Sequence, residues 1–435
     1  MPIVQISRIQ HRRGKRTDLP QLAAGELGWV VDEQKLFIGN GTVADGAPAV
    51  GNTEIVTSGS SAFTTALAHT YKGYLGDSTP VGTSQQRTLQ QRLDDYVSVK
   101  DFGAKGDDST ADVTAIQNAI DEIYKDTDKD DTRARRVLFF PAGTYRINAA
   151  LKIPPYAHLV GEGPDKTIIK NSGNNAVMVT QDDDGNVGAD IGNSGATRPQ
   201  QIQISNMTLR NTVAYGGVSL DRVKKAFFNN VLFHGSYASG GADASTSKGV
   251  TVNHSNASFG TSNVTFNQCQ FTKFARLVDI SYNATNIRFQ ACDFATAYYG
   301  ALIGAEMDGS TAGLDDGPRD VQFTSSSWST IAQQAILVAP TTGATDGAGP
   351  RHIVSHANFF AKTVANDGGG TGTFSVVPVI QFDNDECTSV QDFFERTDLR
   401  QADGSSNLNA APEVQGIGVS SKLIKSQTLP DNTSS

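Results

Sequence analysis

The stretch VTFNQCQF (Val264–Phe271) and its near copy IRFQACDF (Ile287–Phe294) decide the fold that this sequence predicts. Each begins with an apolar residue and has a second one two positions later. A small or apolar residue follows three positions after that, and a large apolar residue two positions further on. Residues two apart on a strand share a face, so each pair points to one side. The two residues between the pairs fit a bend between two sheets.

The same four-position pattern recurs after residue 200, at both short and long intervals along the chain. A β-helix coil of about two dozen residues explains the short intervals. Inserts rich in Gly and Ser at 235–249, 296–318 and 340–350 explain the long ones. The other copies are Ile202, Ile204, Met207, Leu209; Ala226, Phe228, Val231, Phe233; Val321, Phe323, Ser326, Trp328; and a degenerate Ile353, Ser355, Asn358, Phe360.

A further strand candidate follows several copies, at 277–280, 301–303 and 336–338. An antiparallel sandwich would instead show hairpin turns at regular spacing, without a fixed internal phase. We therefore predict an all-β fold, a right-handed parallel β-helix or solenoid.

A helix is predicted ahead of these coils. Val113, Ile116, Ile120 and Ile123 form one apolar stripe, and Ser109 with Asp112 resembles a capping box at its start. We expect this helix to cap the open end of the strand stack. Strand signals follow at 137–140, 143–147, 151–153, 158–160 and 167–170.

The chain before the helix divides into two parts. Residues 1–57 read as a small β module with a hairpin in GELGWVVDEQKLFIGNG (Gly25–Gly41). Residues 58–97 read as a linker with a short helix carrying Leu89, Leu93 and Tyr96, either a trimeric neck or a helix packed on the next domain. The β-helix is expected over 98–394, and 395–435 is expected to be a short tail or docking segment.

Composition excludes several classes of protein. The chain has 435 residues and a net charge of −9, which argues against a nucleic-acid groove. No stretch approaches the roughly 20 apolar residues of a membrane span, and the N-terminus lacks the layout of a secretory signal. The three cysteines show no CxxC spacing, so neither a disulfide framework nor a zinc site is expected. No cofactor and no metal are expected.

Two parts of the sequence resemble known families. VKDFGAKGD (Val99–Asp107), VLFFPAGTYRIN (Val137–Asn148) and LVGEGPDKTIIK (Leu159–Lys170) resemble the start of the pectate-lyase-like β-helix superfamily, which includes polysaccharide-degrading enzymes and phage tailspikes. The hairpin, with GNTEIVT (Gly51–Thr57), resembles the N-terminal module of phage tail fibres and tropism determinants. That module is associated with virion attachment and trimerisation.

Together the resemblances imply a bacteriophage tail protein: a fibre, tailspike or fibre adaptor located in the virion and assembled in the host cytoplasm. They imply a homotrimer that contacts other tail or baseplate proteins through its N-terminal module and takes host surface glycan as a partner. Two alternatives stay open, a polysaccharide depolymerase (hydrolase or lyase) and a non-catalytic glycan-binding module. The sequence favours a protein that is not an enzyme.

Cleavage of a polysaccharide would need paired carboxylates on one groove. The best pairs are two residues apart, and acidic residues of the neighbouring loop are available to join the first pair; ordinary surface carboxylates are the alternative reading of all of them. Exposed tyrosines are the candidates for stacking on sugar rings. The candidate catalytic residues are Glu306, Asp308, Asp383 and Asp385, with Asp315, Asp316 and Asp320 nearby; the candidate glycan-binding residues are Tyr237, Tyr298 and Tyr299.

Overall fold

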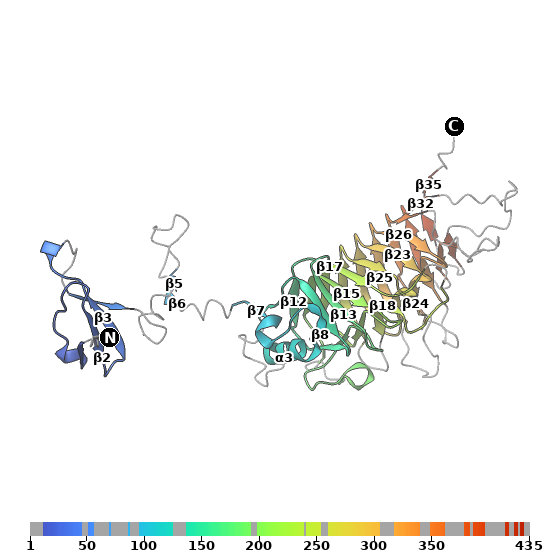
Figure 1. The fold of residues 1–435 in the computed structure, drawn as a ribbon. Coiled ribbons are helices and arrows are strands. Elements are labelled where there is room, and N and C mark those ends of the chain that lie inside the picture. The colour runs from blue at the N-terminus through green and yellow to red at the C-terminus, as the bar shows by residue number, and fades with distance from the viewer. Residues whose placement is uncertain are drawn as a thin grey trace, which may run out of the picture. The chain divides into compact units, whose positions relative to one another are not determined.

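A computed structural model gives the fold (Figure 1). The chain forms two compact units, Met1–Asp95 and Tyr96–Ser435, and each is described by itself. The structure describes residues 12–45, 51–55, 69–70, 86–87, 95–124, 136–192, 198–238, 241–253, 260–304, 317–339, 349–361, 378–382, 386–395, 414–416, 422–424 and 427–429.

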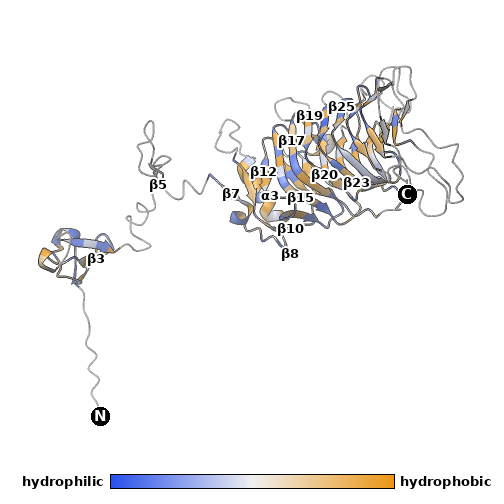
Figure 2. Cartoon of the chain, turned by 90° about the horizontal axis from the view of Figure 1, so that it is seen from above, coloured by the Kyte–Doolittle hydropathy of each residue, from blue (hydrophilic) through white to orange (hydrophobic). Residues whose placement is uncertain are grey.

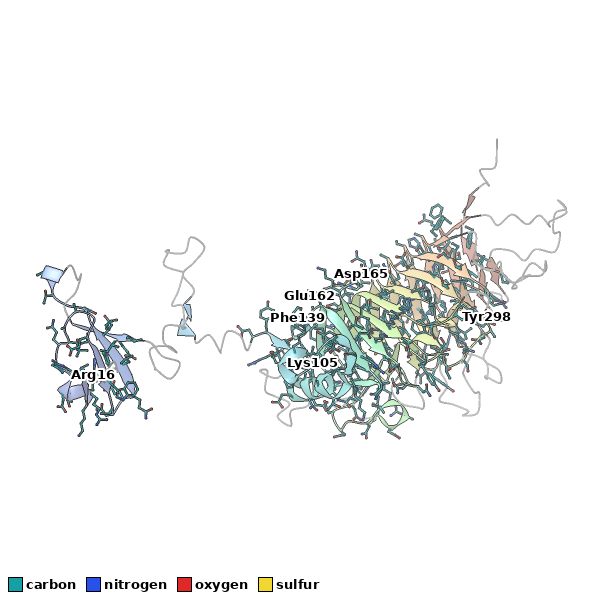
Figure 3. The ribbon with its side chains drawn as sticks, in the orientation of Figure 1. Arg16, Lys105, Phe139, Glu162, Asp165 and Tyr298 are labelled. Carbon is teal, nitrogen blue, oxygen red and sulfur yellow. The ribbon has the colours of Figure 1, made fainter. Side chains whose placement is uncertain are left out.

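The first unit contains a four-stranded sheet in which β2 and β3 form the predicted antiparallel hairpin. β1 pairs with β2 in parallel, and β4 extends the sheet beyond β3. Leu22, Val30 and Phe37 form its small core, and the guanidinium of Arg16 lies 4.3 Å from the centre of the Phe37 ring (Figure 3). The strands of this unit are β1 (Arg12–Gly14), β2 (Leu27–Val30), β3 (Lys35–Gly39) and β4 (Asn52–Ile55), with the short pair β5 (His69–Thr70) and β6 (Gln86–Arg87).

The second unit is the predicted parallel β-helix, with strands stacked coil upon coil (Figure 1). One sheet of twenty strands contains both halves of each repeat. The chain turns a corner between the two halves, but each half pairs with the equivalent strand of the neighbouring coil. Its strands are β7 (Val97–Ser98), β8 (Asp107–Ala111), β9 (Leu138–Phe140), β10 (Gly143–Ile147), β12 (His158–Gly161), β13 (Thr167–Asn171), β15 (Ile202–Asn211), β17 (Ala226–His234), β19 (Ser262–Asn267), β20 (Gln270–Thr272), β22 (Thr285–Gln290), β23 (Asp293–Ala297), β25 (Arg319–Thr324), β26 (Ser327–Ile331), β28 (Val354–His356), β29 (Phe359–Phe360), β31 (Thr388–Val390), β32 (Phe393–Glu395), β34 (Lys422–Ile424) and β35 (Gln427–Leu429).

A second sheet of nine strands forms the remaining side of the coils. It contains all three further strands that the sequence predicted, at 277–280, 301–303 and 336–338. Its strands are β11 (Leu151–Ile153), β14 (Met178–Thr180), β16 (Val218–Asp221), β18 (Lys248–Asn253), β21 (Arg276–Ile280), β24 (Tyr299–Ile303), β27 (Ile336–Val338), β30 (Ile380–Phe382) and β33 (Val414–Gly416).

The corner inside each repeat has one residue in the left-handed region. These residues occupy the second of the two positions between the inward pairs, where the sequence predicted a bend. Residues other than glycine adopt this backbone conformation at an energetic cost, which the hydrogen bonds between neighbouring coils must offset. The residues, whose φ angles lie between 50° and 56°, are Asn206, Asn230, Gln268, Ala291, Ser325, Ala357 and Gln391.

The core lies along the axis of the stack, and apolar residues recur along its strands (Figure 2). All inward positions predicted from the six repeats are buried, Ser355 and Asn358 of the degenerate copy included. Phenylalanines of neighbouring coils stack on one another, for example Phe233 and Phe271 with ring centres 4.7 Å apart. The predicted inward repeat is therefore confirmed.

The predicted helix is α3 (Val113–Tyr124), and its buried face packs against β9, β10 and β11. The predicted capping box is wrong. Ser109 lies in β8, and the carboxylate of Asp112 accepts hydrogen bonds from the main-chain N–H groups of Lys105 and Gly106 at 2.7 and 3.0 Å. The buried carboxylate thus holds the preceding loop.

Two further predictions concern the segments on either side of the β-helix. The neck helix suggested by Leu89 and Leu93 lies outside the described residues. At the other end, β33, β34 and β35 pair in parallel with β30, β31 and β32, so stacked strands continue beyond 394 into the segment expected to be a tail.

Candidate functional site

The structure describes all of the candidate tyrosines but only one of the candidate acidic residues. Glu306, Asp308, Asp383 and Asp385 lie outside the described residues, as do Asp315 and Asp316. Asp320 is described, and its carboxylate lies 3.3 Å from Nδ1 of His352, whose Nε2 lies 2.9 Å from Glu386. All three tyrosine candidates are described, and the chain around each contacts the turn that connects β20 to β21.

The loop between β17 and β18 is anchored on that turn. Tyr237 donates its main-chain N–H to the carbonyl of Lys273 at 2.7 Å, and its hydroxyl donates to the carbonyl of Gly241 at 2.9 Å. A Cβ on Gly235 would come within 2.2 Å of the carbonyl oxygen of Lys273. Only glycine therefore permits this close approach of loop and turn.

An ion-pair network holds the far half of the same loop. The guanidinium of Arg276 lies 2.8 Å from Asp243 in the loop and 3.2 Å from Asp279 on its own strand. Lys248 lies 3.1 Å from the same buried Asp279. Burial would lower the pKa of Arg276, but the two carboxylates outweigh burial and raise it. Two cations and two anions compensate one another, so the network supports the loop.

Between the loop and the twenty-stranded sheet lies a pocket of about 360 Å³. The basic residues that line it are Arg210 at the end of β15, His234 at the end of β17, and Lys273. Burial lowers the pKa of His234, and the positive charges of Arg210 and Lys273 lower it further. No carboxylate is among the described residues that line the pocket.

Tyr237 also lines this pocket, although it is only 8% exposed. Tyr298 and Tyr299 are held beside the turn, since both donate their main-chain N–H to the carbonyl of Ala275. Their rings meet edge to face with centres 4.9 Å apart, and burial raises the pKa of Tyr299. Figure 3 shows Tyr298 on the second unit.

The chemistry of the pocket suits binding of an anion rather than hydrolysis by paired carboxylates. Guanidinium and ammonium groups bind carboxylate or phosphate, and an aromatic wall offers apolar contact to a sugar ring. Among the described residues, no group of three or more His, Cys, Asp or Glu side chains is placed to hold a metal. No described helix has the length and apolar character to cross a membrane.

Sequence reasoning missed the basic residues of this site. Arg210, His234 and Lys273 come from three separate parts of the chain and belong to no motif. A signal was present, because Arg210 directly follows the last inward position of its repeat, and His234 does the same. Aligning the repeats on their outward positions would have placed these two residues side by side.

Comparisons with known proteins match the two units separately. Residues 96–299 match the family model described as rhamnogalacturonase A/epimerase, pectate lyase-like. Residues 9–43 match the major tropism determinant N-terminal domain. Both resemblances stated from the sequence are confirmed: the chain carries a pectate-lyase-like β-helix domain behind a tropism-determinant-like N-terminal domain.

Curated relatives match over a short stretch only. Alginate lyase 7 of Azotobacter vinelandii is 39% identical over 80 residues, which is 17% of this chain and 8% of that protein. Mannuronan C5-epimerase AlgE2 of the same organism is 39% identical over 83 residues, 18% of this chain and 8% of that protein. The match thus spans less than a tenth of either relative.

Solved structures that are similar to this chain include ORF18 of Geobacillus virus E2, with a TM-score of 0.48 and 16% identity over 97% of this chain and 73% of that one. The Dettilon tailspike protein has a TM-score of 0.48 and 10% identity over 79% of this chain and 64% of that one.

Proposed function

We propose that this chain is a structural protein of a bacteriophage tail, a fibre, tailspike or fibre adaptor that attaches to the virion and projects its β-helix for host attachment. One observation carries the proposal: a tropism-determinant-like domain at 9–43 precedes a pectate-lyase-like β-helix domain at 96–299 in one chain. A parallel β-helix suits a projecting part, because each coil pairs with its neighbours over its whole length and the stack is stiff.

The proposal includes a homotrimer that docks on other tail or baseplate proteins through its first unit, after assembly in the host cytoplasm. Native mass spectrometry of the purified full chain should give three copies. Antibodies raised against the chain should label the tail of purified virions, and a chain lacking residues 9–43 should fail to enter them. Virions that lack the protein would contradict the proposal.

Inhibition of phage adsorption by the purified protein tests host attachment. Purified full-length protein added to host cells before infection should slow phage adsorption in proportion to its concentration, because it occupies the same receptor. The same amount of protein unfolded by heat is the control. Unchanged adsorption at saturating protein would remove host attachment from the proposal and leave only a structural role.

A second candidate function is cleavage of host surface polysaccharide. It is favoured by the local match to alginate lyase 7 and by the family model matched at 96–299. Incubation with host capsule or lipopolysaccharide should then release new sugar ends, and Glu306→Gln or Asp383→Asn should abolish the release. Absence of new ends with the wild-type chain would exclude this activity on the polysaccharides tested.

A further inference from the structure

Four basic residues, three of them cationic at neutral pH and the fourth a histidine, stand in register on neighbouring strands of the twenty-stranded sheet. Arg146 pairs with Lys170, Lys170 with Arg210, and Arg210 with His234. We call these four residues the basic row. Adjacent strands lie about 4.8 Å apart, so the row extends roughly 14 Å along the axis of the stack.

The row faces outward. Side chains alternate along a strand, so the residues next to the row face the opposite way. Arg146 and Arg210 are exposed, and Lys170 and His234 are partly exposed. The residues directly before them, all buried in the core, are Tyr145, Ile169, Leu209 and Phe233.

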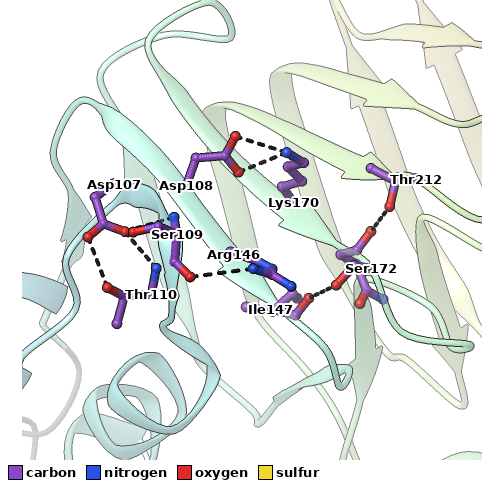
Figure 4. Close-up of polar contacts among 10 residues, drawn as sticks. Asp107, Asp108, Ser109, Thr110, Arg146, Ile147, Lys170, Ser172 and Thr212 are labelled. Carbon is purple, nitrogen blue, oxygen red and sulfur yellow. Dashed lines mark hydrogen bonds and ion pairs between the residues drawn. The ribbon is translucent and has the colours of Figure 1, made fainter.

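The alignment is electrostatically unfavourable without a partner. Like charges placed opposite one another on neighbouring strands destabilise a sheet. Asp108 offsets part of the charge, with 2.8 Å between it and the ammonium group of Lys170 (Figure 4). Among the described residues, the side chain of Arg146 forms one hydrogen bond, to the carbonyl oxygen of Ser109 at 3.4 Å. The row therefore keeps a net positive charge in a chain whose total is −9.

The charge is confined to these coils and ends at the pocket. The next positions in the same register are Thr272, Ala295 and Ser329, which carry no charge. At this boundary lies the 360 Å³ pocket, where Lys273 adds a further cation. The row and the pocket thus form one continuous track with an aromatic wall, Tyr237, at its end.

We propose that the basic row and the adjoining pocket bind a linear acidic polysaccharide, its carboxylates paired with the row. This inference rests on the proposed function and specifies the chemical class of the host glycan. A repeating anion matches cations repeated at coil spacing, and arginine can hold a carboxylate through two hydrogen bonds. A nucleic acid fits less well, because such binding relies on many more phosphate contacts and the remaining charge of this chain is negative.

The test measures binding of the full-length protein to oligomers of alginate, a carboxylated polymer, with neutral dextran of equal length as the matched ligand. Alginate should bind and dextran should not, and affinity should fall as salt is added, because salt screens exposed charges. Arg210→Gln should weaken alginate binding about 10-fold, as expected for one charge-assisted contact. The double variant Lys170→Gln/Arg210→Gln should weaken it further.

Lys225→Gln is the control, because Lys225 is an exposed lysine that directly precedes β17, at the opposite end of that strand from His234. It should bind as the wild type does, and all variants should keep the wild-type circular dichroism spectrum. Equal binding of alginate by wild type and double variant, equal binding of dextran, or binding of duplex DNA in place of alginate would each overturn the inference. Those results would leave labelling of virions unaffected, so failure of the inference is distinguishable from failure of the proposed function.

Discussion

The central coils and the later coils of the β-helix share one inward repeat, but the side chains at the inward positions differ in polarity. In the central coils the second inward position holds Phe228, Phe266, Phe289 and Phe323, which stack with ring centres 4.7 to 4.8 Å apart. In the two coils that follow, the same position holds Ser355 and Ser389. The same backbone path therefore tolerates an aromatic or a polar interior.

The third inward position becomes polar one coil earlier, in the repeat that contains Phe323. Cys269 and Cys292 occupy it in the central coils, and Ser326, Asn358 and Asp392 follow. Each of these three polar side chains accepts a hydrogen bond from the main chain of the preceding coil, so the polar groups form a ladder along the axis. Buried polar groups are tolerated when they are paired in this way. The fourth position stays aromatic across both regions, and its stack includes Phe360 on Phe394 at 4.9 Å.

The largest expected effect is the loss of one ring from the central stack. Phe271→Ala should lower the free energy of unfolding by about 3–5 kcal/mol, because Phe271 is fully buried between Phe233 and Phe294. Urea titration followed by circular dichroism measures the change. Phe227→Ala, which removes a ring that is 39% exposed, is the control and should cost less than about 1 kcal/mol. Equal effects would contradict the assigned inward phase.

A buried acid in an early coil should make stability depend on pH. Burial raises the pKa of Asp221 to about 6, so the folded protein holds this proton more tightly than the unfolded chain, whose value is near 3.8. Its contribution to stability is complete below pH 3.8 and is lost as pH rises through 6, a change of roughly 2–3 kcal/mol.

Asp221→Asn should remove that part of the pH dependence while keeping an oxygen that can accept the hydrogen bond from Ser219. Urea midpoints at pH 4 and pH 8, compared between the variant and the wild type, measure it. An identical pH profile in both proteins would show that Asp221 does not titrate as its burial requires.

Breaking the polar ladder should destabilise the later coils locally. Asp392 accepts hydrogen bonds from the main-chain N–H of Asn358 at 2.9 Å and from the hydroxyl of Ser389 at 2.5 Å. Asp392→Ala leaves both donors buried without this acceptor, at a cost on the order of 2 kcal/mol. Hydrogen exchange should quicken in residues 353–361 and 386–394 and stay unchanged in 264–294. Asp392→Asn, which keeps an acceptor, should cost less; a uniform response along the helix would refute a local role.

The smallest effect is expected at Ser326, where the buried cysteines of the central coils meet the polar ladder of the later coils. Ser326 lies between Cys292 and Asn358 in the ladder, and Ser326→Cys would extend the column of thiols by one coil. The change should cost less than about 1 kcal/mol, because the two side chains differ little in size. Thermal unfolding measures it. A loss as large as that of Asp392→Ala would show that the hydroxyl bonds of Ser326 contribute more than its packing.

The sequence allowed the coils to be predicted because burial imposes a period on the side chains. Positions such as Phe266 and Phe289 repeat whatever happens in the loops between them. The later coil with Cys387, Ser389, Asp392 and Phe394 was not recognised as a copy, because an acidic residue, Asp392, stands at the third position, where the pattern requires a small or apolar one. Its burial depends on hydrogen bonds to Asn358 of the preceding coil and to Ser389 of its own coil, which an apolar pattern does not record.

The candidate site was predicted only in part. Tyr237, Tyr298 and Tyr299 could be chosen as aromatic residues in or beside inserts, and all three lie around the turn that connects β20 to β21. The network of Arg276 with Asp243 and Asp279 had no sequence signal, because Asp243 belongs to an irregular insert far from Arg276 in the chain. Loop geometry of that kind follows from contacts, and those contacts form only after the coils have stacked.

The sequence by itself determined which side chains face inward and therefore that the chain stacks in coils, because a two-residue alternation broken by one bend has few other ways to bury its apolar residues. An alignment of the repeats would pair Arg210 with His234, but tertiary structure alone decided that Arg146 and Lys170, which lie outside the predicted copies, join them. Arg146, Lys170, Arg210 and His234 are far apart in the chain and are separated by connections of unequal length. Only the hydrogen-bonded register between coils, which is indifferent to the length of the inserts, sets them in one row.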